Sequence, residues 1–513
     1  MDSTVELVVI GGDLGWPQWN GRSVLDRSDR SVGWYPIGVY DAADLRCLRL
    51  LTSSWEVNTV AIHPAGRLIA IGTGAYDGGY AFEGELLIHD LDRGTTTSML
   101  NTLRMIASLE WLDAETLSAV VAPATDEELN DWPLIEYEGY ELRHPDWARL
   151  DRRSVDLNVE HRTRVEWVQS DPAVLKDSCI RLSTRLGAAW QSRRQAWALA
   201  ADGDGVLVGL ERAVERWDDE GNLVWRTALN GTCTQLQVGP DGSVVAAVWG
   251  QPGSAEPLDR PTTVVALDAR SGAILDQAAV GYPAILVNRE SGDMLIRDTR
   301  HGPAAAHPGA IWSSSFRQEG ELGLSAYDLF NHYFDIRRAT QFLILVGDDP
   351  RSWESKHVAE VRRTPTGSWT VERLFPLAWR SGDHLYGGPG VFVHDPAGEA
   401  IVHTGIVHDG RGLLPGNAFI ARRRYPDGQL IWHVPLDNQI TALDESDGRI
   451  IAVTNLGELV VVNASDGSVL ARADRLSVDE NPIVPLSVAI DGTDGLWLGA
   501  LDGRVLQIHL RWS

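Results

Sequence analysis

Cysteine, lysine and long apolar runs are scarce in this chain. Its three cysteines, in 513 residues, are too widely spaced for a disulfide framework or a metal knuckle. Only two of its 45 basic residues are lysines, so few groups could form a Schiff base. No stretch approaches the roughly 20 apolar residues of a membrane-spanning helix, and the N-terminal residues carry acids where a signal peptide carries bases. These absences predict a reduced, cytoplasmic protein with no membrane segment.

Positive charge is also in short supply. The formal net charge is −26 at pH 7, a sign that repels nucleic-acid phosphates and anionic lipid headgroups. Nucleic acid and membrane surfaces are therefore not expected as partners. With 44% hydrophobic residues, the chain has enough apolar side chains to form a globular core.

Catalytic signatures are missing as well. The sequence contains no G-x-S-x-G elbow, no phosphate-binding G-x-x-x-x-G-K-[ST] loop, no G-x-G-x-x-G after a strand and no H-E-x-x-H. We therefore assign no catalytic residue and predict neither a cofactor nor a resident metal.

Two groups of residues invite a metal-site hypothesis and are better explained otherwise. His384, His394, His403 and His408 lie close in sequence, but positions five apart on a flat strand point to opposite faces. Three acid-glycine clusters resemble fragments of calcium loops, yet none completes the twelve-residue pattern, and Asp and Gly are ordinary turn residues. These clusters are 202–205, 444–448 and 491–495.

What the sequence does contain is a recurring hairpin. Two alternating apolar runs flank a polar turn with a glycine, which a tight hairpin needs because one residue adopts a positive φ. The copies span 86–100, 214–229, 264–278, 420–436 and 457–472, with turn glycines Gly94, Gly221, Gly272, Gly428 and Gly467.

A second hairpin of the form strand, D/P-x-G, strand precedes most copies, at 60–74, 236–250, 392–405 and 442–455. The unit therefore has four short strands, with period-2 patterning throughout. This pattern predicts an all-β fold: a single β-propeller domain over residues 1–513, with about eight four-stranded blades and seven as the alternative. We expect the ring to close by pairing of the N- and C-terminal strands, which removes exposed sheet edges.

The first hairpins, such as "VAIHPAGRLIAIGTG", resemble WD40-type blades. The second hairpins, with "GNLVW" and "GQLIW", resemble the repeats of bacterial quinoprotein-like (PQQ-type) propellers, as does "GWPQWNGRS" near the N-terminus. The resemblance implies that Trp225 and Trp432 dock between adjacent blades and are structural. Quinoprotein dehydrogenases typically have a vicinal cysteine pair and are exported, and this chain has no such pair.

Longer segments interrupt the pattern mainly between second and third strands, so they would emerge on one face of a propeller. Elaborated loops on one face indicate the working surface. We place these insertions near 11–33, 74–84, 123–148, 251–262, 300–320, 347–357 and 408–417.

The insertions carry aromatic and acidic residues that suit a basic protein segment or a sugar; tryptophans that fold back onto the core are the alternative explanation. The candidate binding residues are Trp16, Trp19, Tyr76, Tyr80, Trp132, Trp353, His408 and Arg411.

These observations favour a non-catalytic scaffold that binds a protein partner on its insertion-rich face. Two alternatives stay open. One is a small-ligand site at the mouth of the central channel, for a sugar or a metal-assisted lyase or lactonase reaction. The other is a degenerate quinoprotein-like cofactor binder. The sequence leaves the oligomeric state open.

Overall fold

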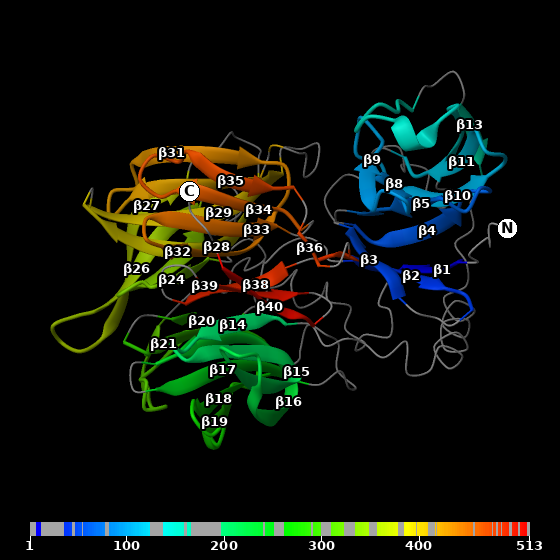
Figure 1. The fold of residues 1–513 in the computed structure, drawn as a ribbon. Coiled ribbons are helices and arrows are strands. Elements are labelled where there is room, and N and C mark those ends of the chain that lie inside the picture. The colour runs from blue at the N-terminus through cyan, green and yellow to red at the C-terminus, as the bar shows by residue number, and fades with distance from the viewer. Residues whose placement is uncertain are drawn as a thin grey trace. The chain divides into compact units, whose positions relative to one another are not determined.

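The chain forms two compact units in the computed structural model (Figure 1). Unit 1 comprises residues 1–22, 33–192 and 477–482, and unit 2 comprises residues 23–32, 193–476 and 483–513. The structure describes residues 7–11, 35–43, 47–53, 55–76, 82–123, 137–157, 162–165, 196–239, 242–250, 261–288, 291–298, 309–322, 334–347, 356–377, 384–396, 398–408, 416, 418–454, 457–474, 476–478, 481–483, 485–491, 495–500 and 503–509.

Unit 1 contains three larger antiparallel sheets. Their strands are β1 (Leu7–Gly11), β2 (Tyr35–Asp41) and β3 (Cys47–Ser53); β4 (Val57–Ile62), β5 (Leu68–Thr73), β8 (Leu86–Asp90) and β9 (Thr95–Ser98); and β10 (Ile106–Trp111), β11 (Thr116–Val121), β12 (Tyr137–Arg143) and β13 (Arg162–Val165). Two small hairpins and a 3-10 turn complete its described elements: β6 (Ala75–Tyr76) with β7 (Phe82–Glu83), β36 (Ser477–Val478) with β37 (Asn481–Pro482), and η2 (Trp147–Arg149).

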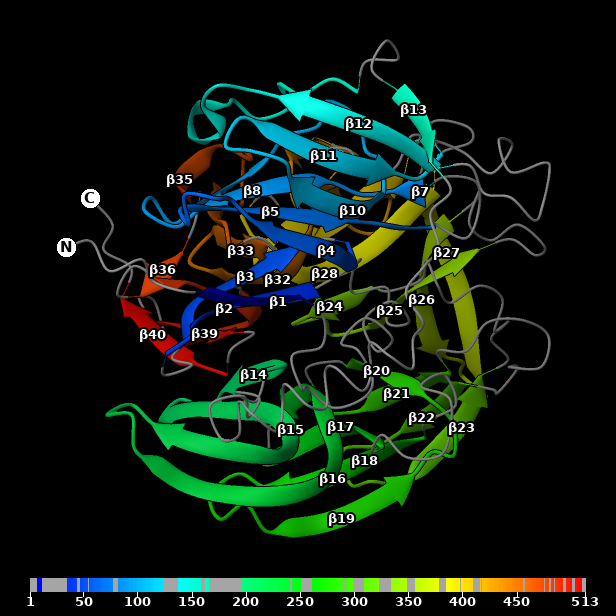
Figure 2. The ribbon, with the colours of Figure 1, turned by 90° about the vertical axis from the view of Figure 1, so that its right-hand side faces the viewer.

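Unit 2 contains the remaining sheets (Figure 2). Its first two sheets hold β14 (Ala198–Ala201), β15 (Gly205–Asp218), β16 (Leu223–Val238), β17 (Ser243–Gly250), β18 (Thr262–Asp268) and β19 (Ile274–Ala279); and β20 (Ala284–Asn288), β21 (Met294–Asp298), β22 (Gly309–Trp312) and β23 (Gln318–Leu322).

The other sheets of unit 2 follow these two in the chain. They hold β25 (Phe342–Gly347), β26 (Lys356–Arg363) and β27 (Trp369–Leu377); β24 (Asp335–Arg337), β28 (His384–Asp395), β29 (Gly398–His408), β30 (Ala418–Arg424) and β31 (Leu430–Leu436); β32 (Ile440–Ser446), β33 (Arg449–Thr454), β34 (Leu459–Asn463) and β35 (Val469–Ala473); and β38 (Pro485–Asp491), β39 (Gly495–Ala500) and β40 (Val505–His509).

The six-stranded sheet of unit 2 consists of two repeats joined by shared strands. The first part of β15 pairs with β14, and its second part pairs with β16 from Glu211 onward. The far end of β16 then pairs with β17. Arg212, with φ 63°, lies where β15 changes partner. The chain therefore continues directly from second to third strand here, where most other repeats have a loop.

Burial of apolar side chains explains why the alternating apolar runs of the sequence form sheets that pack against each other. The third strands β18 and β34 are almost entirely buried, whereas the fourth strands β19 and β35 are mostly exposed. The apolar clusters combine side chains from neighbouring repeats; one joins Val391 and Ile420 to Leu443 and Val460. Sheets that bury both faces against neighbours require apolar residues on both faces of their inner strands. The predicted all-β class is confirmed.

Aromatic rings cover three turn glycines of unit 2. A Cβ on Gly272 would lie 2.5 Å from the Trp225 ring, and one on Gly467 would lie 2.8 Å from Trp432. Phe375 covers Gly428 in the same way. In every case the ring comes from the fourth strand of one repeat, and the glycine lies in the turn between the third and fourth strands of the next repeat. Only glycine leaves room for a ring at this distance.

The two tryptophans share a further set of polar contacts. The indole Nε1 of Trp225 donates to the Ala269 carbonyl, and that of Trp432 donates to the Ala464 carbonyl, each at 2.9 Å. Opposite each tryptophan on the paired strand is an arginine bound to an aspartate: Arg216 with Asp202, and Arg422 with Asp395. The same arrangement of a tryptophan, an alanine carbonyl, an arginine and an aspartate thus occurs twice.

Several sequence-based boundaries need correction. β1 pairs with β2 and β40 pairs with β39, so among the described residues the terminal strands do not pair with each other as predicted. The interval 300–320, predicted as an insertion, contains β22 and most of β23, and 123–148 contains β12. Short polar strands with weak alternation hid these elements.

The single domain over 1–513 remains a prediction. No helix in the described part of the chain is long and apolar enough to cross a bilayer.

We expect Gly467→Ala to destabilise the protein more than Gly448→Ala. Both glycines have a positive φ, 76° and 72°, which costs alanine about 1 kcal/mol. Only the Gly467 variant also forces a Cβ into Trp432, adding roughly 1–3 kcal/mol of overpacking, since nothing lies within 4 Å of a Cβ on Gly448. Guanidinium unfolding of the two variants measures the difference. Equal losses would show that the ring does not occupy this space.

Candidate functional site

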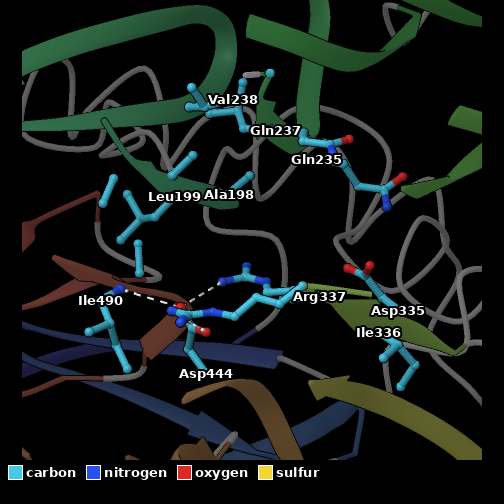
Figure 3. A pocket seen from close by; sticks show the side chains of 16 residues that line it. Ala198, Leu199, Gln235, Gln237, Val238, Asp335, Ile336, Arg337, Asp444 and Ile490 are labelled. Carbon is cyan, nitrogen blue, oxygen red and sulfur yellow. Dashed lines mark hydrogen bonds and ion pairs between the residues drawn. The ribbon is translucent and has the colours of Figure 1, made fainter. Parts of the chain in front are cut away.

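A cavity of about 560 Å³ lies among the first strands of several repeats of unit 2. Figure 3 shows Leu199, Gln237 and Val238 on one side and Arg337 and Asp444 on the other. The lining comes from β14, β16, β24, β32 and β38, strands that lie far apart in the sequence.

The cavity lies at the end of these strands where the chain turns from the first strand of a repeat into the second. Its residues occupy the C-terminal half of β16, β32 and β38, and the whole of the shorter β14 and β24. In each antiparallel sheet this end carries the turn from first to second strand, and loops between second and third strands emerge at the opposite end. Within unit 2, the cavity and the predicted insertions therefore belong to opposite ends of the sheets.

Asp444 is the buried polar centre of one cavity wall. Its side chain is only 7% exposed. Oδ1 accepts from the Glu445 backbone N–H at 2.9 Å and lies 3.1 Å from Arg338 Nη2. Oδ2 accepts from the Ile490 N–H at 3.3 Å and lies 3.7 Å from Arg337 Nη1. A buried carboxylate with four donors around it is fixed in orientation, and it holds both arginines.

Two glutamines define the facing wall. The Gln235 amide is fully used: its Nε2 donates to the Leu286 carbonyl at 2.9 Å, and its Oε1 accepts from the Leu286 N–H at 2.8 Å. This pair ties β16 to β20 of the next sheet. Gln237 is less buried and also faces the cavity (Figure 3).

Sequence analysis did not identify these residues as a site. Asp444 was assigned to an acid-glycine turn, and Arg337 belongs to "DIRRAT", which matches no motif. The only available signal was two adjacent arginines after an acid in a short apolar strand. The acid-glycine clusters at 202–205 and 444–448 do form turns, between β14 and β15 and between β32 and β33.

Most of the predicted binding aromatics cannot be placed. Tyr76 pairs with Phe82 in β6 and β7, and His408 ends β29 opposite His384. The other predicted residues lie outside the described part of the chain: Trp16, Trp19, Tyr80, Trp132, Trp353 and Arg411. The insertions near 74–84 and 408–417 do lie between second and third strands, β5 and β8 in one sheet and β29 and β30 in another.

His403 is buried in the apolar interior. Its ring lies 5.9 Å from the Phe334 ring and 5.6 Å from that of Phe419, measured between centroids. Burial, with a smaller contribution from Arg423, lowers the pKa of His403 to about 3. Across the described residues, no three His, Cys, Asp or Glu side chains group as a metal site would require.

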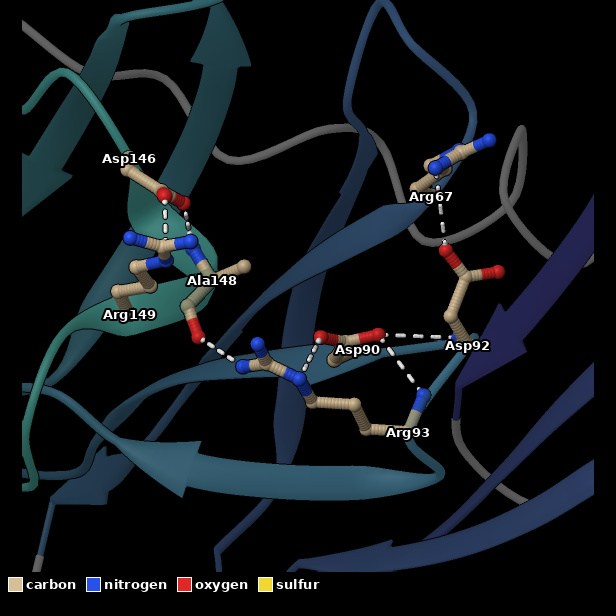
Figure 4. A network of polar contacts seen from close by, with 7 residues as sticks. All are labelled: Arg67, Asp90, Asp92, Arg93, Asp146, Ala148 and Arg149. Carbon is tan, nitrogen blue, oxygen red and sulfur yellow. Dashed lines mark hydrogen bonds and ion pairs between the residues drawn. The ribbon is translucent and has the colours of Figure 1, made fainter.

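At the turn between β8 and β9, unit 1 has polar contacts in the place where three such turns of unit 2 have aromatic rings. Asp90 holds Arg93 in the turn before β9, and the Arg93 Nη1 donates to the Ala148 carbonyl of η2 at 2.7 Å (Figure 4). Nothing lies within 4 Å of a Cβ on Gly94 in that turn. This exposed network links neighbouring sheets, and its isolated surface pairs contribute little stability each.

Comparison with known proteins finds the following. No protein-family profile and no curated protein matches the chain. Among solved structures, a computationally designed protein, Ika8, shares 14% identity over 62% of this chain and 98% of its own, with a TM-score of 0.37. A chain of the mitotic checkpoint complex shares 14% identity over 61% of this chain and 87% of its own, with a TM-score of 0.44. Similarity this weak says nothing of function. The antiparallel four-stranded sheets themselves are consistent with the β-propeller resemblance.

We expect His403 to make folding stability depend on pH. The unfolded histidine has a pKa near 6.5, and the folded one near 3. Below pH 6.5 the unfolded chain therefore takes up a proton that the folded chain does not, so the folded state loses stability as pH falls. Between pH 7 and 5.5 the wild type should lose about 1.3 kcal/mol more than His403→Gln. Urea unfolding at both pH values tests this, and an unchanged gap between the two proteins would contradict it.

Proposed function

We propose that the chain is a non-catalytic scaffold that binds a protein partner through the loops between second and third strands. The carrying observation is the arrangement of the sheets. In the sheets that contain β5, β17 and β29, the longer connections all follow the second strand, while tight turns close the other end. Stacked sheets make a rigid platform, and loops on such a platform are where binding residues concentrate.

We further propose that unit 2 is a closed seven-bladed β-propeller. Three contacts support closure. β24 pairs in parallel with β28 of the next repeat. The Ser487 Oγ donates to the Ala196 carbonyl at 2.8 Å, and the Ala196 N–H donates to the Ala500 carbonyl at 3.1 Å, which joins the last sheet to the first residues before β14. The inner strands of this ring would be β14, the end of β16, β20, β24, β28, β32 and β38.

The predicted partner is a basic protein segment in the cytoplasm. The net charge of −26 attracts cationic partners and speeds their association at low salt. The insertion sequences add acids at 126–128, 131, 348 and 349 beside the predicted aromatics Trp132 and Trp353. Aromatic anchors within a charged rim are typical of interfaces whose affinity comes from a few residues.

Replacing residues 77–81 and 409–415 with short Gly-Ser linkers tests the scaffold proposal, because these replacements leave the buried Phe82 and Glu83 in place. We expect a stoichiometric partner, co-purified with tagged protein from the native cell, to be lost from these variants while their melting temperature stays close to that of the wild type. A matched control replaces the turn residues 465 and 466, at the opposite end of their sheet, with alanines. A partner that survives both loop replacements would contradict the proposal.

The cavity of unit 2 favours a second candidate, a small-ligand site at the channel mouth. A volume of about 560 Å³ is within the range of small-molecule sites. The quinoprotein-like cofactor binder remains a prediction that no described residue supports.

A further inference from the structure

We infer that the cavity of unit 2 binds a ligand with one carboxylate group and a small aliphatic body, recognised by Arg337. This inference rests on the second candidate function, the small-ligand site, and is independent of the scaffold proposal, whose loops in unit 2 lie at the other end of the sheets. Two observations carry it: a fixed arginine with unused donors, and an apolar wall.

Arg337 is held by one edge of its guanidinium. Its Nη1 donates to the Val488 carbonyl at 2.6 Å and lies 3.7 Å from Asp444 Oδ2. The side chain is 28% exposed, so it is partly covered and still reaches the cavity. No described residue accepts from its Nε or Nη2. These two nitrogens form the edge of the guanidinium that binds a carboxylate with two parallel hydrogen bonds.

Asp444 does not compete with the ligand for this edge. Both of its oxygens already accept from backbone N–H groups of Glu445 and Ile490, and Arg338 binds Oδ1. The buried carboxylate therefore positions the two arginines and balances part of their charge. Arg338 also lines the cavity, but it is paired with both Asp444 and Glu445, from which it lies 3.1 and 3.8 Å.

Strand β24 presents Arg337 to the cavity. Residues 335 and 337 are two apart on β24, so their side chains extend from the same face of the strand, whereas Ile336 packs into the apolar core behind it.

The opposite side of the cavity suits an aliphatic group. Ala200, Leu236 and Val238 line it and are partly exposed, and Ile490 adds an apolar side chain beside Asp444. Small and branched apolar side chains favour an aliphatic group next to the carboxylate, and a leucine side chain with its adjoining amide is a suitable probe of that chemistry. Gln237, in the same wall, can hydrogen-bond that amide.

Titration calorimetry with N-acetyl-leucine and N-acetyl-leucinamide tests the inference on the full chain. We expect the acid to bind at least about tenfold more tightly than the amide, because a charge-assisted pair is lost in the amide. Arg337→Gln should weaken binding of the acid by about tenfold or more. The matched control, Arg424→Gln, removes an exposed arginine that pairs with Asp427 and should bind like the wild type.

Melting temperatures separate a folding defect from a binding defect, and two further arms test the cavity and identify the source of the carboxylate. Ala200→Phe enlarges a residue of the cavity wall, which also packs against the core, without removing a charge, and it should abolish binding while the variant still melts cooperatively. A peptide that ends in leucine identifies a protein terminus as the ligand if it binds more tightly than N-acetyl-leucine, and a free small acid if it binds more weakly. The inference is overturned if acid and amide bind alike, if Arg337→Gln or Ala200→Phe binds like the wild type, or if no binding is seen at about 10 mM.

Discussion

The contact on which unit 2 depends is an aromatic ring laid over a glycine turn of the next repeat. Trp225, Phe375 and Trp432 each cover such a turn, and each turn must lack a Cβ. Tryptophan adds an indole hydrogen bond to a carbonyl three residues before the glycine, at Ala269 and Ala464. Because the ring and the turn come from successive repeats, this one contact sets the spacing between sheets and excludes water from the space between them.

The cavity follows from the same spacing. Once the outer strands are held by ring-on-glycine contacts, the first strands of the repeats lie at the inner edge of the sheets, where five of them border one cavity. Polar side chains join inner strands of different repeats, as Gln235 does with Leu286 and Arg337 with Val488. These bonds satisfy buried polar groups and leave one guanidinium edge of Arg337 for a ligand.

The sequence predicted local features well because they repeat. The turn glycines have positive φ as expected, and Trp225 and Trp432 were visible because each follows its turn at the same spacing. Phe375 was missed, since "LFPLAW" carries no such signature. The cavity could not be predicted, because its residues are hundreds of positions apart and come together through contacts such as that of the Ser487 Oγ with the Ala196 carbonyl. The division into two units had no compositional boundary to mark it.

The most direct test of the central claim is a double-mutant cycle on Trp432 and Gly467, measured as the free energy of unfolding. If the ring occupies the space of the missing Cβ, Gly467→Ala should be costly in the wild type. In the Trp432→Ala background it should cost no more than the roughly 1 kcal/mol due to its positive φ. A cost for Gly467→Ala that is the same in both backgrounds would contradict the account.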